Sequence, residues 1–410
     1  MDIILHKSLI EEQSSITVTG SKSESNRLLL LQALYPAIKI KNLSNSDDSR
    51  VMKLALSTSD PIIDIHHAGT AMRFLTAYFA MQEGREVILT GSLRMKQRPI
   101  QILVEALNQL GADIQYLETE GCPPLKIKGK KLTKDKVTLR ANVSSQYISA
   151  LLLIAPKLEN GQELTLEGTI TSIPYINMTL DLLHQIGVET RFEGQTIKVK
   201  PLLLTQNPKP KTFTVESDWS SASYFYSIVA LSELGTEITL SSYKKNSLQG
   251  DSVLAEIYKS FGVETTFHKT KISIKKALVA DRQLSFDWDL SNAPDIAQTI
   301  AVTCLGLGLE CHLTGLHTLK IKETDRLVAL KTEMEKFGIN VEITDRSLHL
   351  LPLHKLRGNP SIATYNDHRM AMAFAPMALK TNLQIEEANV VSKSYPTFWE
   401  DLKSIGFQIK

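Results

Sequence analysis

One pattern of apolar and polar residues returns five times along the chain. Each copy reads as the end of an amphipathic helix, then a glycine, then a short and partly alternating strand, as in "LNQLGADIQY" and "YKSFGVETTF". A glycine that ends a helix in the left-handed region explains each copy alone. The near-constant spacing of 76, 75, 76 and 68 residues indicates an internal repeat instead; its glycines are Gly111, Gly187, Gly262, Gly338 and Gly406.

This repeat predicts an α/β fold built from about six strand–helix units. We expect a further copy to end a helix near Pro36, in "LQALYPAIKI". The segment "LLLTQNPKPKT" (202–212) holds two prolines and no helical period, so it is the candidate linker. Because it divides the chain into near-equal halves, it predicts two lobes of three units each, with a cleft between them.

Polar and cationic turns stand directly before several of the apolar helices. "TGSKSESNR" (19–27) precedes four leucines, and "HHAGTAMR", "NVSSQY", "SNAPDIA", "IKETDR", "YNDHRM" and "SKSYPTF" occupy similar positions. A helix N-terminus exposes unpaired N–H groups and roughly half a positive charge, which suits an anion. Arginine and lysine at the same turns add affinity for phosphate or carboxylate; the cations are Lys22, Arg27, Arg73, Arg94, Lys96, Arg98, Lys322, Arg326, Arg369 and Lys393.

Residue spacing within these turns sharpens the prediction. Ser23 and Arg27 lie four residues apart, as do Lys322 and Arg326, so each pair is expected to share a helix face. Glu323 is expected one turn from Arg326, and a carboxylate among cations can be tuned as a proton carrier. Asp295 and His368 are further titratable candidates.

Each of these motifs has a simpler interpretation when taken alone. Residues 322–326 could form a solvated ion-pair face, and Asp295 could be favourable charge at a helix start. Ser144 and Ser145 could be plain N-caps, and His368 could be structural. The same chemistry recurs in both halves of the chain, and this recurrence favours a functional interpretation.

Composition narrows the class of protein. The chain is 43% hydrophobic and 22% charged, which is typical of a soluble globular protein. A net charge of +2 provides no basic surface of the kind used by nucleic-acid-binding proteins. Three cysteines without metal-ligand spacing favour a reducing cytosol. There is no secretory apolar core at the N-terminus and no apolar run of membrane-spanning length, so we expect a cytoplasmic protein without membrane or nucleic-acid partners.

The motifs together resemble one known family. "GSKSESNR", "AGTAMR", "LTGSLRMKQRP", "SSQY", "PYI", "PDIA", "KETDRL", "YNDHRMAM" and the lysine of "SKSYPTFWEDL" are similar, in order, to the 5-enolpyruvylshikimate-3-phosphate (EPSP) synthases. The resemblance covers residues 20 to 402. It implies an inside-out α/β barrel of two similar lobes, each of three repeated units. By analogy, one lobe is 19–213 and the other is 1–18 with 214–410, and the active site lies in the cleft between them.

The resemblance also implies a reaction. Members of the family are transferases that move the enolpyruvyl group of phosphoenolpyruvate to the 5-hydroxyl of shikimate 3-phosphate. Phosphate leaves from a tetrahedral intermediate, and the product leads to chorismate and the aromatic amino acids. The family needs charge neutralisation, positioning and proton transfer from the protein, but no metal and no organic cofactor. It is commonly monomeric.

Site residues are carried over from the family motif by motif. The resemblance implies a base for the 5-hydroxyl at Asp295 and a proton carrier at Glu323, with Lys22 also a candidate and His368 beside them. It implies a shikimate 3-phosphate site made by Lys22, Ser23, Arg27, Ser144, Ser145, Gln146, Ser172, Tyr175, Asp295, Thr318 and Lys322. It implies a phosphoenolpyruvate site made by Lys22, Gly69, Arg94, Gln146, Arg326, Arg369 and Lys393.

The sequence departs from the common family pattern at a few positions. His67 and Phe74 stand where Asn and Pro are usual around "AGTAMR", Thr19 replaces a Pro, and Thr318 replaces an Asn. None of these changes removes a catalytic group. Gly69 resembles the type that is sensitive to glyphosate, an inhibitor that competes with phosphoenolpyruvate in this family, so we expect sensitivity.

Two other functions fit parts of the sequence. The sister enzyme that transfers enolpyruvyl to UDP-N-acetylglucosamine shares the architecture, but it typically carries a Cys or Asp in the loop that here reads "LTGSLRMKQRP". A non-catalytic anion-binding protein on the same scaffold would not need carboxylates such as Asp295 and Glu323 among its cations. The shikimate reaction is therefore the favoured prediction.

Overall fold

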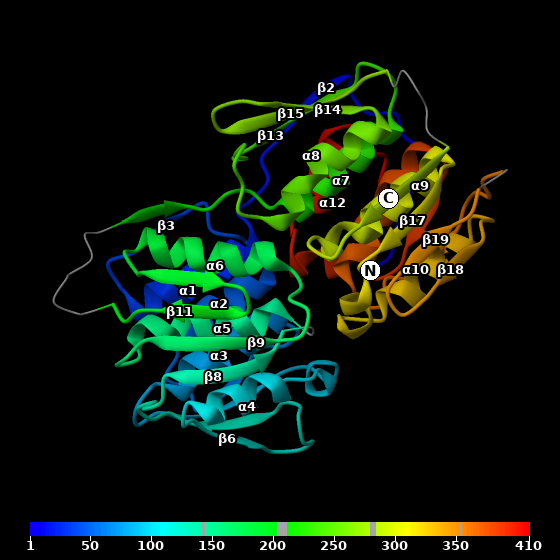
Figure 1. The fold of residues 1–410 in the computed structure, drawn as a ribbon. Coiled ribbons are helices and arrows are strands. Elements are labelled where there is room, and N and C mark those ends of the chain that lie inside the picture. The colour runs from blue at the N-terminus through cyan, green and yellow to red at the C-terminus, as the bar shows by residue number, and fades with distance from the viewer. Residues whose placement is uncertain (142–143, 203–210, 279–283, 353–354) are drawn as a thin grey trace. The chain divides into compact units, whose positions relative to one another are not determined.

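The computed structural model describes residues 1–141, 144–202, 211–278, 284–352 and 355–410. The chain forms two compact units (Figure 1). We call Ser21–Val215 the N-terminal unit, and Met1–Gly20 with Glu216–Lys410 the C-terminal unit. Residues 203–210 of the predicted linker lie outside the described residues. The predicted cleft between lobes stays a prediction.

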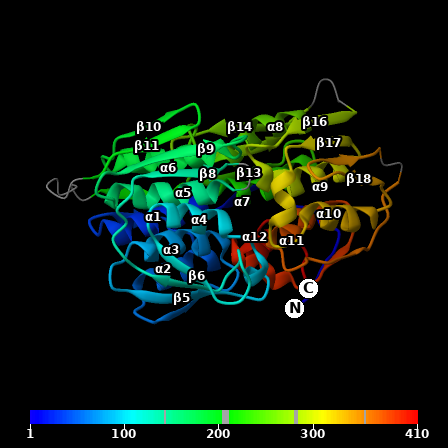
Figure 2. The same cartoon turned by 60° about the horizontal axis from the view of Figure 1, so that its bottom comes forward.

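The N-terminal unit holds two four-stranded sheets with the same topology and one parallel pair. In each larger sheet a parallel pair is extended by an antiparallel hairpin, in the orders β4-β5-β7-β6 and β8-β9-β11-β10. Figure 2 shows the second of these sheets along the edge of its unit, beside α5 and α6. The strands are β3 (Lys39–Lys41), β4 (Ile62–Asp64), β5 (Glu86–Thr90), β6 (Asp113–Tyr116), β7 (Leu125–Lys128), β8 (Lys136–Arg140), β9 (Gln162–Glu167), β10 (Thr190–Glu193), β11 (Thr196–Val199) and β12 (Thr212–Thr214), with β3 parallel to β12.

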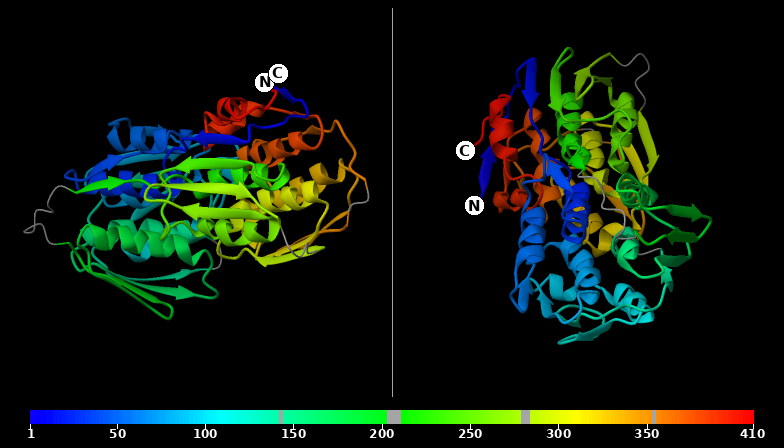
Figure 3. Two further views of the ribbon diagram at one scale, coloured as in Figure 1. Left: turned by 90° about the horizontal axis from the view of Figure 1, so that it is seen from above. Right: turned by 90° about the vertical axis from the view of Figure 1, so that its left-hand side faces the viewer.

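The C-terminal unit repeats this plan. Its four-stranded sheets have the orders β2-β13-β15-β14 and β16-β17-β19-β18, and its third sheet is β1-β21-β20. Backbone hydrogen bonds join Ile4 to Lys410 and place the two chain termini together (Figure 3). The strands are β1 (Ile3–Leu5), β2 (Gln13–Ile16), β13 (Glu237–Ser241), β14 (Val263–Phe267), β15 (Lys271–Lys276), β16 (Ser285–Asp289), β17 (Glu310–Thr314), β18 (Val341–Ile343), β19 (Leu348–Leu350), β20 (Ser361–Ile362) and β21 (Leu383–Ile385).

Two kinds of helix alternate along the chain. The first kind is buried on nearly all sides, including some polar and charged residues near the helix starts: α1 (Lys22–Leu34), α3 (Gly69–Ala80), α5 (Ser145–Ile154), α7 (Trp219–Leu231), α9 (Ala297–Leu307) and α11 (His368–Phe374). The second kind is α2 (Asp47–Ser57), α4 (Gln101–Gln109), α6 (Ile173–Gln185), α8 (Leu254–Ile257), α10 (Arg326–Glu335) and α12 (Phe398–Ser404). Short 3₁₀ helices are η1 (Met95–Gln97), η2 (Ala155–Lys157), η3 (Gly250–Val253), η4 (Tyr258–Phe261), η5 (Pro294–Ile296), η6 (His317–Ile321), η7 (Ala375–Leu379) and η8 (Ala388–Lys393).

The buried helices pack against one another within each unit. In the N-terminal unit α3 contacts both α5 and α1, and in the C-terminal unit α9 contacts both α7 and α11. Helices therefore form the core, and the predicted α/β fold of repeated strand–helix units is confirmed. Among the described residues, the sheets of each unit stay separate and do not close into one continuous barrel. Within the same residues, no helix is both long and apolar enough to cross a membrane.

The five repeat glycines end helices as the sequence predicted. Each lies just after a helix of the second kind or its 3₁₀ extension, with φ between 73° and 111°. The expectation of a further copy ending near Pro36 is wrong. The helix that ends there, α1, is one of the buried helices, and the corresponding second helix is α2, which ends at Ser57. The sequence pattern does not reveal the α2 copy, because α2 leads directly into β4 without the glycine and hairpin that follow α4, α6 and α10.

Candidate active site

Helix starts in the C-terminal unit bring three cations to one carboxylate. Asp295 lies in η5, directly before α9. Its Oδ1 lies 3.3 Å from Lys322 Nζ and 3.1 Å from Arg326 Nη1, and its Oδ2 lies 3.2 Å from Arg369 Nη2. The Asp295 side chain remains 24% exposed, whereas those of Arg326 and Arg369 are 2% and 9% exposed. Asp295 is thus a partly exposed carboxylate in contact with two buried arginines.

Glu323 occupies a second position among the same cations. Its Oε2 lies 2.9 Å from Arg326 Nη2, and its Oε1 lies 3.4 Å from Lys393 Nζ at the end of η8. Its side chain is 13% exposed. Arg326 therefore holds both predicted proton-transfer carboxylates, Asp295 and Glu323, in fixed positions through two different guanidinium nitrogens.

Asp367 belongs to the same charged cluster, although the sequence analysis did not single it out. It is the N-cap of α11, where its Oδ1 accepts a hydrogen bond from the Arg369 backbone N–H at 2.9 Å. Its Oδ2 lies 2.6 Å from Arg326 Nε. An Asp before a helix is a recognisable N-cap signal. Its ion pair with Arg326, 41 residues earlier, leaves no such local signal.

The charges of this cluster stabilise its arginines as cations. Burial lowers the pKa of Arg326, but Asp367, Glu323 and Asp295 raise it by more, so the net shift is upward. For Arg369 the lowering by burial is likewise outweighed, above all by Asp295. Loss of surrounding water instead lowers the pKa of Lys322, and Asp295 opposes that shift.

The expected helical face shared by Lys322 and Arg326 is wrong. Lys322 follows η6 in an extended conformation, with φ −82° and ψ −152°, and α10 begins only at Arg326. Both side chains still reach Asp295 because the turn between them brings the two cations round to η5.

Thr318 lies within η6, and its buried hydroxyl finds no hydrogen-bond partner among the described residues. His368 is 1% exposed, with Nδ1 3.7 Å from Asp367 Oδ1.

Arg27 organises a second set of predicted residues, in the N-terminal unit. Its guanidinium donates to the Ser23 carbonyl at 2.8 Å, which confirms that these two residues share a face of α1. It also donates to Thr179 Oγ1, Ser149 Oγ and the Tyr175 carbonyl at 2.8, 2.9 and 3.2 Å. These four hydrogen bonds all go to uncharged groups, and burial lowers the pKa of Arg27 to about 10. These four partners therefore do not neutralise its positive charge, although Glu24 is near enough to raise its pKa.

The starts of α1, α3, α5 and α6 surround this arginine. Ser144 is the N-cap of α5, where its Oγ accepts from the Gln146 N–H at 3.3 Å. The Gln146 side chain donates to Thr70 Oγ1 in the first turn of α3, also at 3.3 Å. Ser145 is buried in the first turn of α5, and Ser172 precedes α6 in the left-handed region, with φ 55°. The hydrogen bond between Gln146 and Thr70 thus links the starts of α5 and α3.

Lys22 and Gly69 stand at the starts of α1 and α3. Lys22 Nζ lies 3.5 Å from Asp48 Oδ2, a second carboxylate that the sequence analysis missed. Arg73 Nη1 donates to the Gly69 carbonyl at 2.9 Å. A Cβ atom on Gly69 would lie 2.6 Å from Arg98 Nη1. Arg94, by contrast, is exposed, so the buried cations beside Gly69 are Arg73 and Arg98.

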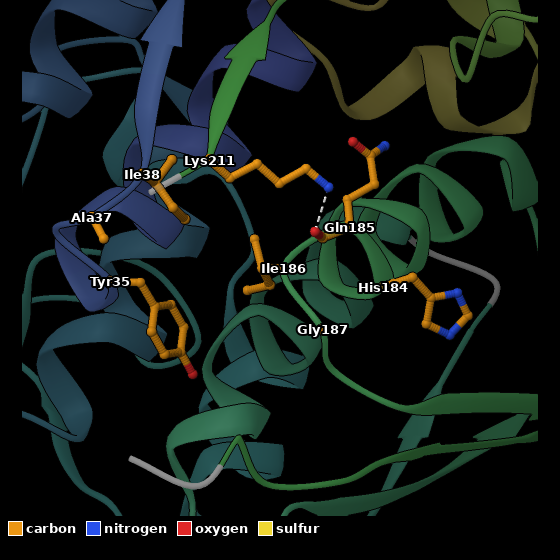
Figure 4. Close-up of a pocket in the computed structure, with 8 residues that line it drawn as sticks. All are labelled: Tyr35, Ala37, Ile38, His184, Gln185, Ile186, Gly187 and Lys211. Carbon is orange, nitrogen blue, oxygen red and sulfur yellow. Dashed lines mark hydrogen bonds between the residues drawn. The ribbon is translucent and has the colours of Figure 1, made fainter. Parts of the chain in front are cut away.

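Each unit therefore assembles its own share of the predicted residues. Among the described residues, no group of three or more His, Cys, Asp and Glu side chains is arranged to hold a metal ion. A separate pocket of about 280 Å³ lies where α1 and α6 end, and Figure 4 shows Lys211 crossing it to the Gln185 carbonyl. None of the predicted site residues lines that pocket.

Solved structures share this fold over the whole chain. An EPSP synthase from Acinetobacter baumannii covers 100% of this chain and 99% of its own, with a TM-score of 0.78 at 21% identity. The enolpyruvyl transferase NikO from Streptomyces tendae covers 100% and 98%, with a TM-score of 0.74 at 12% identity. The fold is therefore that of the enolpyruvyl transferases.

Sequence comparisons identify the family within that class. The model of EPSP synthase (3-phosphoshikimate 1-carboxyvinyltransferase) matches residues 53–402. A 3-phosphoshikimate 1-carboxyvinyltransferase of Bacteroides fragilis is 48% identical over 403 residues, or 97% of this chain and 96% of its own. One from Haemophilus influenzae is 36% identical over 428 residues, or 96% of each. The chain belongs to the EPSP synthase family, and the prediction of an enolpyruvyl-transferring enzyme of the shikimate pathway is confirmed.

Proposed function

We propose that this chain transfers the enolpyruvyl group of phosphoenolpyruvate to the 5-hydroxyl of shikimate 3-phosphate and releases phosphate. The single observation that carries the proposal is the pair of carboxylates, Asp295 and Glu323, held by the same buried arginine. Binding anions requires cations only. Carboxylates fixed among the cations add groups that can move protons.

The reaction needs two proton transfers in the addition and one, at the methyl group, in the elimination. In the addition, the 5-hydroxyl loses its proton as its oxygen bonds to C2 of phosphoenolpyruvate, and the methylene carbon gains a proton to become a methyl group. In the elimination, the methyl group loses a proton and the C2–O bond to phosphate breaks. In our proposal Asp295 is the base for the 5-hydroxyl and Glu323 carries the proton at the methylene carbon. Lys22 is a second candidate for that proton, and His368 lies beside Asp367 in the same cluster.

The anionic groups of the substrates are assigned to the cations and helix starts. Arg27, with its uncharged partners, supports a shikimate 3-phosphate site together with Ser23, Ser144, Ser145, Gln146, Ser172, Tyr175, Thr318 and Lys322. For phosphoenolpyruvate we propose Arg326, Arg369 and Lys393, together with Lys22, Gly69, Arg94 and Gln146. Fixed cations of this kind stabilise charge that develops in a transition state without having to reorganise. Family membership also supports a monomeric, cytoplasmic enzyme that uses no metal or organic cofactor.

Carboxylate variants test this proposal. Glu323→Gln and Asp295→Asn keep the shape of each side chain and remove its ability to exchange a proton. We expect phosphate release to fall by about a hundredfold or more in each variant. Glu335→Gln is the matched control, since this carboxylate lies at the far end of α10, the helix that Arg326 begins, and pairs with Lys331. Full activity in both site variants, with a normal control, would refute the assignment of the carboxylates.

A further inference from the structure

A serine hydroxyl connects Arg369 to a buried carboxyl group that has no part in the mechanism above. Ser220, in α7, accepts a hydrogen bond from Arg369 Nη2 at 3.3 Å. The same hydroxyl donates a hydrogen bond to Asp251 Oδ2 in η3. The same guanidinium also contacts the backbone carbonyl and the Oδ2 of Asp295. Ser220 therefore supplies the side-chain contact that ties Arg369 to α7.

We propose that Asp251 is a positioning residue that orients Arg369 through Ser220. An ionised carboxylate only accepts hydrogen bonds, so the Ser220 hydroxyl must point its proton at Asp251. Its oxygen lone pairs are then directed to the guanidinium. A protonated Asp251 can donate to Ser220 instead, which allows the hydroxyl to turn and compete with Arg369. The inference rests on the proposed role of Arg369 in binding phosphoenolpyruvate.

The surroundings of Asp251 place this change in an accessible pH range. The residue is 1% exposed and faces the negative charges of Asp295 and Asp218 and the positive charge of Arg369. Burial, followed by Asp295, raises the pKa of Asp251 to about 6, although Arg369 and Ser220 act in the opposite direction. The carboxyl group should therefore be ionised at pH 8 and largely protonated at pH 5.

Steady-state kinetics from pH 5 to pH 8 test the inference with two variants. Ser220→Ala removes the hydroxyl that connects Arg369 to Asp251, and Asp251→Asn replaces the carboxyl group by an amide that is uncharged at every pH. At pH 8 we expect each variant to raise the KM for phosphoenolpyruvate about threefold to tenfold, with kcat changed less than about twofold. Ser227→Ala is the matched control, because Ser227 is a buried hydroxyl on the same helix that bonds to Thr303 instead.

The pH profile separates positioning from a merely structural effect. Phosphoenolpyruvate itself titrates near pH 6, so the informative quantity is the KM of each variant divided by that of the wild type. We expect this ratio to approach one as the pH falls to 5. A ratio that stays constant from pH 5 to pH 8, or an unchanged KM at pH 8, overturns the inference. If one variant fails to fold, the KM ratio of the other variant still tests the inference. Absence of turnover in the wild type would overturn the proposed function, and the inference with it.

Discussion

Arg326 Nε lies 2.6 Å from Asp367 Oδ2, and neither side chain is more than 2% exposed. The pair joins the first residue of α10 to the N-cap of α11. Asp367 also accepts from the backbone N–H of Arg369, so one carboxylate fixes the starts of two helices that carry phosphoenolpyruvate-binding candidates.

Removing one member of this buried pair should be strongly destabilising. Asp367→Ala leaves Arg326 charged, buried and short of an ionic partner, so we expect the free energy of unfolding to fall by about 3 to 5 kcal/mol. Urea unfolding measures this. Asp345→Ala is the control, because that carboxylate pairs with Lys320 at the surface and is 92% exposed, so its removal should change the free energy of unfolding far less. Equal effects of the two substitutions would contradict the importance given to the buried pair.

Gly69→Ala should weaken phosphoenolpyruvate binding. The added Cβ would lie 2.6 Å from Arg98 Nη1 and 3.0 Å from Arg73 Nη1, so the two buried arginines or the start of α3 must move. We expect the KM for phosphoenolpyruvate to rise more than that for shikimate 3-phosphate. Inhibition by glyphosate, predicted for the wild type, should weaken in parallel.

A glycine outside the site provides the control for that substitution. Gly358→Ala places its Cβ 2.6 Å from Thr381 Oγ1, a similar degree of crowding that involves no predicted site residue. It should leave the KM for phosphoenolpyruvate unchanged. A wild type that turns over undiminished at saturating glyphosate would refute the prediction of sensitivity.

Asp251→Asn should stabilise the protein, and the gain should be larger at higher pH. The pKa of this carboxyl group is raised from 3.8 in the unfolded chain to about 6 in the folded one. The folded state therefore holds the proton more tightly, and stability is lost as the pH rises through 6. At pH 8 the variant should be about 3 kcal/mol more stable than the wild type, and at pH 5 the gain should be about half of that. Thermal or urea unfolding at both pH values measures how the stability gain depends on pH. A gain that grows toward low pH would contradict this prediction.

A buried glutamate braces the strained turn before Asp367. Tyr365 and Asn366 both have positive φ, at 53° and 54°. Glu333, 0% exposed, accepts from the Tyr365 hydroxyl at 2.7 Å and from the Ala363 N–H at 3.0 Å. Burial raises the pKa of Tyr365 to about 12, so its hydroxyl stays a donor at neutral pH.

Loss of this brace should be measurable in stability. Tyr365→Phe should lower the free energy of unfolding by about 1 kcal/mol. Asn366→Gly should raise it by about 1 kcal/mol, because glycine adopts a positive φ without steric cost. Denaturant unfolding of the two variants compares them directly, and shifts of the same sign would contradict this account of the turn.

The sequence predicted those features that repeat or that act locally. The spacing of the five glycines predicted the α/β repeat, because a glycine in the left-handed region follows each helix of the second kind except α2. The polar turns predicted the helix starts that carry Ser23, Ser144 and Arg369. Both kinds of signal depend on residues within one or two helical turns, where sequence spacing translates directly into geometry.

Features that depend on remote contacts could not be predicted in this way. Asp367 pairs with Arg326 across 41 residues, and the Ser220 hydroxyl links Asp251 to Arg369. Arg94 and Arg98 look equivalent in "LRMKQRP", yet only Arg98 is buried beside Gly69. Such differences are set by packing between elements and not by local spacing.

Acceptor choice by the wild type tests the central claim most directly. Phosphate release would be followed with phosphoenolpyruvate and either shikimate 3-phosphate or UDP-N-acetylglucosamine. We predict release with shikimate 3-phosphate alone, accompanied by the enolpyruvyl ether at its 5-hydroxyl. Release with the sugar nucleotide instead would assign the chain to the sister activity. No release with either acceptor, despite binding of shikimate 3-phosphate, would show that the cations bind anions without catalysis.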